Sequence, residues 1–361
     1  MFDAVNSPKP NREVRIDALR GLFLVLMAVN HVPSELHPWT DHSLGFFSSA
    51  EGFFFLSGLL AGRVYTRRWE RDGAAVARRA AWRRAGAIYL AQGLTLAVVF
   101  TWTLAWHGAT GTLPGHASPI IAERPLFAAG AALVLGLQPA LFDILPIYAA
   151  FMLLLPGLLA IYARGWQALV LAASVGIWLA GYFWRGPIMP DELATHAFPW
   201  AAWQLPLVVG SVCGNLWARG RTEFFAVRTP VVIGAGLICA GCFLIRHAYV
   251  PPPVPIPLLE SLSSKNFLGP LRVLNVAAAF YLILCAATRW AGFMRVPPLA
   301  FLGRHTLPVF CAHIVAAYGI YAFPATFDSG ADARWLSTFT ILGVMFAAAA
   351  LHAAWQKSAR S

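Results

Sequence analysis

The feature that most constrains this chain is a series of apolar runs, each roughly 18–25 residues long, that recurs from one end to the other. A helix of that length crosses a ~30 Å hydrocarbon core. Of the 361 residues 58% are hydrophobic and 12% charged, and the mean hydropathy is +0.63. No stretch between the runs could build a soluble domain, so we predict an all-α polytopic membrane protein with one membrane-embedded domain over residues 1–361.

The runs predict about ten transmembrane helices. The first could be a cleaved signal peptide, but it lacks a small-x-small cleavage site and contains Arg20, so we expect it to be retained. The apolar segment 125–137 is too short to span, and a re-entrant or interfacial helix is expected there. The predicted spans lie near residues 16–34, 44–65, 85–107, 140–162, 166–184, 197–217, 230–246, 271–288, 298–323 and 335–353.

The distribution of positive charge predicts the orientation. Of the 27 Lys and Arg residues, 19 fall in one set of alternate loops and termini and five in the opposite set. By the positive-inside rule both termini are then cytoplasmic, with a cytoplasmic N-terminal segment at 1–14 and a tail at 354–361. Because the net charge of +11 lies beside the spans, we expect the lipid bilayer and not nucleic acid as its partner.

Polar residues bracket the first span, RIDALRGLFLVLMAVNH (15–31). Arg20 and His31 are eleven residues apart, so they lie within ~20° on one helix face and ~16 Å apart along the axis. Asp17 lies within ~40° of that face and can pair with Arg20. Such residues in a span usually face a cavity or a partner. The alternative is that Arg20 only snorkels to lipid phosphate and His31 caps the helix.

The second span places Glu51 inside the membrane, where it could lie level with His31. A carboxylate there would orient the imidazole and raise its basicity, so His31, Glu51 and Asp17 are the catalytic candidates. The alternative for Glu51 is a structural ion pair with Arg272 or Lys265. Small residues of the same span are assigned to close helix packing: Gly52, Ser57, Gly58 and Gly62.

Further polar residues lie inside the later spans. We expect a set near the non-cytoplasmic ends to hydrogen-bond a polar substrate such as a sugar. Arg304 lies instead near the cytoplasmic start of the ninth span, on the level of Arg20. For each residue alone, a structural polar contact is an equally good explanation. The substrate-binding candidates are Asp143, Gln204, Arg272, Asn275 and His313.

All five cysteines fall inside apolar runs, where disulfide exchange and metal capture are disfavoured. Cys239 and Cys242 form a CxxC, which we assign to small-residue packing. The histidines lack the spacing of a metal site, so no metal is expected.

Taken together, the motifs resemble a known family. Arg20-x10-His31 is followed by AEGFFFLSGLLAGRVY (50–65), and further blocks are FDILPIY, FPWAAWQLPLVVG, KNFLGPLRVLNVAAAFYL and LGRHTLPVFCAHIV. In this order they resemble the membrane acyltransferase-3 superfamily, and more narrowly its OpgC branch, the succinyltransferases of osmoregulated periplasmic glucans. The Pro-rich stretch 251–257 has no place in that pattern.

The resemblance implies a ten-helix enzyme of the bacterial inner (cytoplasmic) membrane. It would move an acyl group from cytoplasmic acyl-CoA, either succinyl-CoA or acetyl-CoA, to a hydroxyl of a periplasmic glucan or other envelope glycan. By the same resemblance Arg20 binds the donor phosphates and His31 is the base. No motif fixes the acyl group, the glycan or the oligomeric state.

The residues suggest how such a reaction would run. Arg15, Arg20 and Arg304 would hold the CoA head group, since guanidinium groups suit phosphate geometry. The pantetheine arm would then reach His31, which removes the proton of a sugar hydroxyl or transiently carries the acyl group. If the acyl group is succinyl, Arg272 is the best-placed cation for its carboxylate.

Three alternatives remain open at this level. The first keeps the fold but makes the enzyme an O-acetyltransferase of an exopolysaccharide. The second is a proton-coupled transporter in which Arg20, Glu51 and His31 form a relay. The third is a structural membrane protein without chemistry, which leaves the polar residues inside its spans unexplained.

Overall fold

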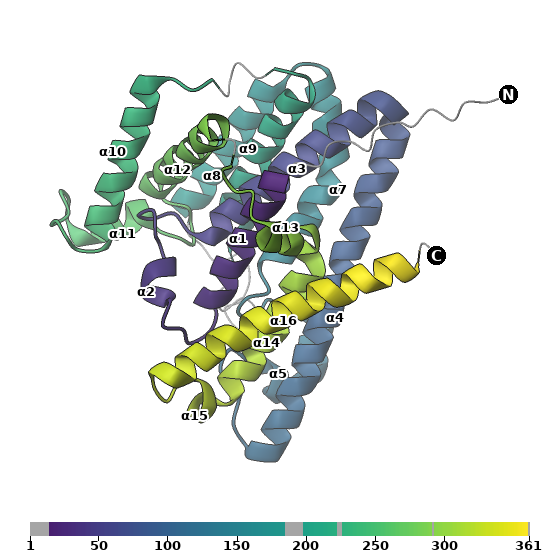
Figure 1. The fold of residues 1–361 in the computed structure, drawn as a ribbon. Helices are drawn as coiled ribbons and strands as arrows, with labels where there is room; N and C mark the ends of the chain where they lie inside the picture. The colour runs from purple at the N-terminus through teal and green to yellow at the C-terminus, as the bar shows by residue number, and fades with distance from the viewer. Residues whose placement is uncertain (1–13, 185–197, 222–225, 291, 360–361) are drawn as a thin grey trace.

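A computed structural model describes residues 14–184, 198–221, 226–290 and 292–359 (Figure 1). The predicted segment 1–14, apart from its last residue, and the final two residues of the tail lie outside them. The described residues form α-helices and no β-strand. The helices are α1 (Val14–Asn30), α2 (His37–Thr40), α3 (Ser49–Asp72), α4 (Ala74–Thr110), α5 (Ile120–Glu123), α6 (Pro125–Leu133), α7 (Ile144–Ala163), α8 (Gln167–Trp184), α9 (Trp200–Ala218), α10 (Thr229–Arg246), α11 (Ile256–Ser263), α12 (Pro270–Arg289), α13 (Pro297–Arg304), α14 (Thr306–Ala322), α15 (Pro324–Phe327) and α16 (Ala331–Ser358).

Six of these helices are long and apolar enough to cross a bilayer: α4, α7, α8, α10, α12 and α16. The chain is a membrane protein, as the apolar runs predict. Helices also occupy the other predicted spans, but α1 has only 17 residues, and neither α3 nor α9 meets the combined requirement for length and apolarity. The structure therefore supports six apolar spans, or seven with the bent pair described next, where ten were predicted.

The predicted span 298–323 is not one helix. It is divided into α13 and α14, which meet at 91° around His305. The cause lies in Pro308, which has no N–H to donate to the carbonyl of Arg304 and whose ring would clash with it in a continuous helix. Both parts contact the first helix: α13 packs closely against α1, and α14 also contacts α1.

The most extensive helix contact joins α3 to α9 through two matching glycine pairs. A Cβ on Gly58 or Gly62 would come within 2.1 Å of a carbonyl oxygen of α9, and one on Gly210 or Gly214 within 2.2 Å of a carbonyl oxygen of α3. Such spacing at i and i+4 lets two backbones touch, as in small-xxx-small helix pairs. The packing role predicted for the glycines of the second span is confirmed at these positions.

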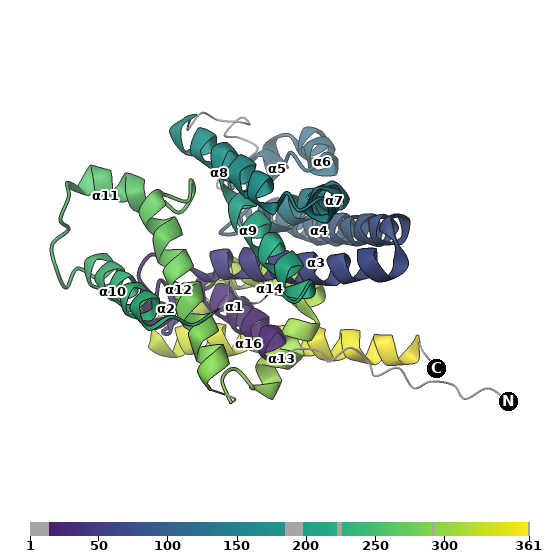
Figure 2. The same cartoon turned by 90° about the horizontal axis from the view of Figure 1, so that it is seen from above.

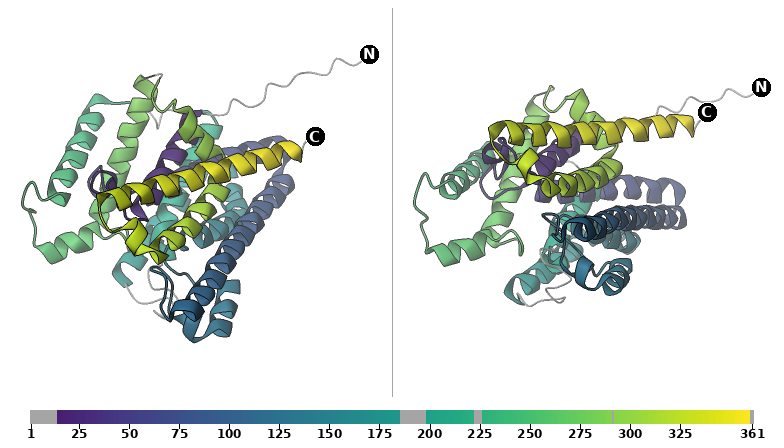
Figure 3. Two further views of the ribbon diagram at one scale, coloured as in Figure 1. Left: turned by 60° about the horizontal axis from the view of Figure 1, so that its bottom comes forward. Right: turned by 90° about the horizontal axis from the view of Figure 1, so that it is seen from below.

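Helix α1 lies in the middle of the bundle, with α3, α12, α13 and α16 around it (Figures 1 and 2). It packs most closely on α13, where a Cβ on Gly21 would meet the Leu299 carbonyl and one on Gly303 the Asp17 carbonyl. Helix α16 crosses α14 and α1 on the other side (Figure 3). The first span is thus enclosed by protein over much of its length.

The apolar segment 125–137 contains α6, a helix of nine residues. Its length of ~14 Å is too short to cross the membrane. It contacts α4 and α5 at one edge of the structure. This arrangement fits the prediction of a helix that does not span.

Candidate active site

The centre of the candidate site is a pair of histidines from α1 and α14. His31 directly follows the last residue of α1 and is partly exposed, whereas His313 is fully buried. Nδ1 of His31 lies 3.3 Å from Nε2 of His313, and the two rings are stacked with centroids 5.5 Å apart. If the Nδ1–H of His31 donates to His313, the Nε2 of His31 is an acceptor, which is the state a general base requires.

Glu51 does not contact His31 in the described structure. Its Oε1 accepts a hydrogen bond of 2.8 Å from Nη1 of Arg272, and its Oε2 accepts bonds from the backbone N–H and the hydroxyl of Ser48. The bond from the Ser48 N–H is one half of a capping box at the start of α3, whose other half is the bond from the Glu51 N–H to the Ser48 side chain. The ion pair with Arg272, raised as the alternative from sequence, is therefore present, and the side chain that contacts His31 is His313.

Arg272 belongs to a wider polar network at the same level. Its Nε donates to the carbonyl of Ser263 at 2.9 Å, and its Nη2 lies 3.4 Å from Nε2 of His42. The other nitrogen of that ring lies 2.6 Å from Asp41. Partial burial acts to raise the pKa of Asp41, but the hydrogen bond and charge of His42 lower it below its usual value. The network links the loop before α3 to α12.

The other substrate-binding candidates make contacts within the protein. Oδ1 of Asn275 accepts hydrogen bonds from the backbone N–H groups of Phe46 and Phe47, at 2.7 and 3.0 Å. Gln204 joins α9 to α8 through two hydrogen bonds with Ser174, at 2.7 and 2.8 Å. Asp143 is buried immediately before α7. The structure gives Asn275 and Gln204 bonds that hold elements together and does not assemble the candidates into one open ring.

The three arginines predicted to bind the donor lie near the start of α1. Arg15 donates to the carbonyl of Ala287 at 2.6 Å, at the end of α12, and Nη1 of Arg20 lies 3.5 Å from the carbonyl of Gly303. Arg304 follows directly and is exposed.

Asp17 is buried where α1 packs on α13. It precedes His31 by fourteen residues, which is ~21 Å along the helix. The structure thus groups Asp17 with Arg20 and not with the histidine pair.

The helix face between Arg20 and His31 is filled by protein. Leu24 and Met27 lie on that face and are 0% and 2% exposed. A cavity of about 320 Å³ lies instead along another face of α1, roughly 110° around the helix. Helix α1 lines the cavity with Leu19, Leu22, Phe23 and Leu26. The segment from the end of α2 to the start of α3 adds Thr40, Ser43, Leu44, Phe47, Ser48 and Ser49. The remaining lining residues are Ile283, Phe293 and Met294.

Two polar residues of α1 lie beyond the ends of this cavity. Arg15 and Asn30 share the cavity's face of α1, one before Leu19 and one after Leu26, by the helical repeat. The hydroxyl of Thr40, which lines the cavity, donates to Oδ1 of Asn30 at 2.5 Å. Asn30 directly precedes His31 in the chain.

Sequence reasoning missed the role of His313 as the partner of His31. No spacing in the sequence pointed to it, because the two histidines are 282 residues apart and meet only through the packing of α1 and α14. His42 and Thr40 were also missed, because the short connection between the first two predicted spans has no periodic pattern.

Comparison with known proteins gives one match. A family model described as OpgC protein matches residues 12–358, which is nearly the whole chain. No curated protein and no solved structure matches the chain. The match covers α1 to α16, including both histidines of the candidate site, and we conclude that this chain belongs to the OpgC protein family.

Proposed function

We propose that the protein is a membrane O-acyltransferase that moves a succinyl group from succinyl-CoA to a hydroxyl of a periplasmic glucan at the bacterial inner membrane. OpgC membership implies an acyltransferase-type enzyme and suggests a glucan succinyltransferase-like function. The observation that carries the proposal is the His31–His313 pair, where a partly exposed imidazole is held by a buried one.

In this proposal His31 is the general base. Its Nε2 accepts the proton of the sugar hydroxyl while the hydroxyl oxygen attacks the thioester carbonyl of the donor. The carbon–sulfur bond then breaks, and the thiol of CoA leaves with the proton that His31 carried. His313 holds the ring of His31 in the required tautomer and orientation, which is the part that we first assigned to Glu51.

The cavity beside α1 supports a proposal for the route of the donor arm. The face between Arg20 and His31 is closed by Leu24 and Met27, so an arm cannot follow it without moving core residues. The cavity lies along a neighbouring face of α1, and one of its lining residues is Thr40, which is hydrogen-bonded to Asn30. We propose that the pantetheine arm lies there and that opening of the Thr40–Asn30 bond admits the thioester to His31.

This route assigns the arginines different tasks. Arg15 lies on the cavity's own face of α1 and would hold the phosphates nearest the entrance, with Arg20 and Arg304 beside it. Arg272 is not proposed for the succinyl carboxylate, because Glu51 already neutralises it at 2.8 Å. The same ion pair removes Glu51 from the proton relay that a transporter would need.

The test is transfer by purified protein in liposomes supplied with a linear or cyclic glucan and either succinyl-CoA or acetyl-CoA. Mass spectrometry of the glucan distinguishes the two acyl groups by mass. Succinylated glucan formed by the wild type, and not by His31→Ala, supports the proposal. Acetylated glucan alone would replace it with an O-acetyltransferase, and absence of any acyl transfer from either donor would reject an acyl-CoA enzyme.

A further inference from the structure

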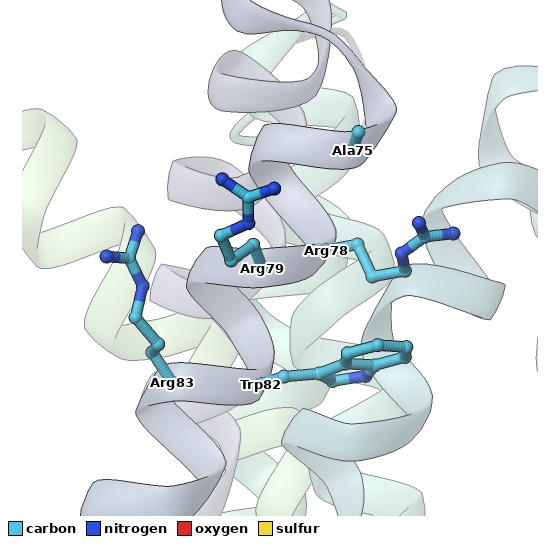
Figure 4. A pocket seen from close by; sticks show the side chains of 5 residues that line it. All are labelled: Ala75, Arg78, Arg79, Trp82 and Arg83. Atoms are coloured by element: carbon cyan, nitrogen blue, oxygen red, sulfur yellow. The ribbon is translucent and has the colours of Figure 1, made fainter.

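A second polar site lies on the first turns of α4, away from the histidine pair. A cavity of about 400 Å³ is lined there by Ala75, Arg78, Arg79, Trp82 and Arg83 (Figure 4). We propose that it binds the phosphate head group of an anionic phospholipid, in the leaflet that α4 enters at this end.

The charge of this cavity is not balanced by neighbouring carboxylates. The segment 63–84 holds eight arginines and two acidic residues. Glu70 bonds to Arg219 at 2.9 Å and Asp72 to Arg71 at 2.7 Å, so both acids are already used. Within the described part of the chain no carboxylate pairs with the cavity's three guanidinium groups, which belong to Arg78, Arg79 and Arg83. They are therefore available to an external anion.

Trp82 gives the cavity a residue type that is typical of membrane surfaces. Its ring is 50% exposed, its Nε1 donates to the carbonyl of Leu153 at 3.2 Å, and the guanidinium of Arg78 lies 5.4 Å from its centroid. Leu153 and Leu154 beside it on α7 are 56% and 68% exposed, as residues facing lipid are. Tryptophan with one polar end and an apolar body is enriched at this depth.

An apolar stripe continues from the arginines along α4. Leu90 and Leu94 follow Arg83 by seven and eleven residues, so they lie within ~20° of it on the same helix face. They are 59% and 60% exposed. The rise from Arg83 to Leu94 is ~16 Å, close to the ~15 Å depth of one leaflet. A head group at the arginines would place its acyl chains along this stripe, which a soluble phosphate compound could not use.

The site is separate from the candidate active site. Helix α4 packs mainly against α7, α3 and α14, whereas α1 packs mainly against α13 and α3. The proposal therefore does not depend on the acyltransferase reaction.

The experiment measures lipid binding by native mass spectrometry of the purified protein with dioleoylphosphatidylglycerol or dioleoylphosphatidylcholine. The wild type should retain the anionic lipid preferentially. The double variant Arg79→Gln/Arg83→Gln should weaken its affinity by about tenfold or more, since each arginine near a membrane surface contributes to anionic lipid binding. The single variant Arg83→Gln should show an intermediate loss and serves if the double variant does not fold.

The matched control is Arg67→Gln/Arg68→Gln, which removes the same charge from α3 outside the cavity. Its affinity should stay within about twofold of the wild type. An equal loss in both double variants would replace the site with a diffuse positive surface. Equal retention of the two lipids by the wild type, or displacement of the anionic lipid by inorganic phosphate or CoA, would also overturn the proposal.

Discussion

Glu51 on α3 and Arg272 on α12 form an ion pair of 2.8 Å in which the side chains are only 1% and 4% exposed. Both charged groups are desolvated, and the cost of that desolvation is offset by the attraction between the two opposite charges. The pair also connects the capping box of α3 to the network around His42. It is one of the links between the loop before α3 and the later helices.

Breaking that pair should destabilise the protein strongly. We expect Glu51→Gln or Arg272→Met to cost about 3–5 kcal/mol, because one buried charge is left unpaired. Thermal unfolding in detergent would measure the loss. The control is Glu51→Leu/Arg272→Met, which removes both charges and should recover much of the lost stability. A double variant as unstable as the sum of its parts would contradict this account.

His313 should act as a positioning residue for His31. Replacing it by leucine removes the partner of Nδ1, and we expect kcat to fall by about 10²-fold with little change in KM for the donor. His313→Gln keeps an acceptor and should recover part of the rate. The pH profile of kcat distinguishes a positioning role from a purely structural role, since replacing a purely structural residue would leave the shape of that profile unchanged.

Filling the cavity beside α1 should block the donor. Leu26→Trp places a bulky ring in a space of about 320 Å³, and transfer from acyl-CoA should fall by at least about tenfold while the protein still folds. Leu153→Trp, on a lipid-facing part of α7, is the control and should retain activity. Full activity of Leu26→Trp would exclude this route.

The arginines near the start of α1 should govern donor affinity. Arg15→Gln is expected to raise KM for acyl-CoA by about tenfold, because one charge-assisted bond to phosphate is lost, with a smaller effect for Arg20→Gln. Initial rates at varied donor concentration measure both. Arg67→Gln, an exposed arginine of α3, is the control. If Arg20→Gln has the larger effect, the donor follows the face first predicted from sequence.

The glycine contact of α3 with α9 should tolerate no added side chain. Gly210→Val would press against the Phe55 carbonyl at 2.2 Å, and we expect a loss of about 1–3 kcal/mol or failure to fold. Gly234→Val on α10 is the matched control, because a Cβ there meets nothing within 4 Å. Similar thermal midpoints for the two variants would show that the contact can open at little cost.

Features that depend on near neighbours in the chain could be predicted. The apolar runs alone predict a helical membrane protein, since no other pattern satisfies the backbone of such segments in lipid. Small residues four apart predicted the close packing of α3, and Arg20 and His31 fall on one face of α1 by the helical repeat. The family's motifs are likewise contained in local stretches.

Only the tertiary structure decided which residues meet. His31 and His313 are 282 residues apart and Glu51 and Arg272 are 221 apart, so their contacts depend on how α1, α12 and α14 are packed. Periodicity gives the face of a helix but not the neighbour of that face. The sequence by itself determined that the chain is a helical membrane protein and that Arg20 and His31 share one helix face, whereas packing decided the number of apolar spans, the partner of His31, the partner of Glu51 and the face of α1 that borders a cavity.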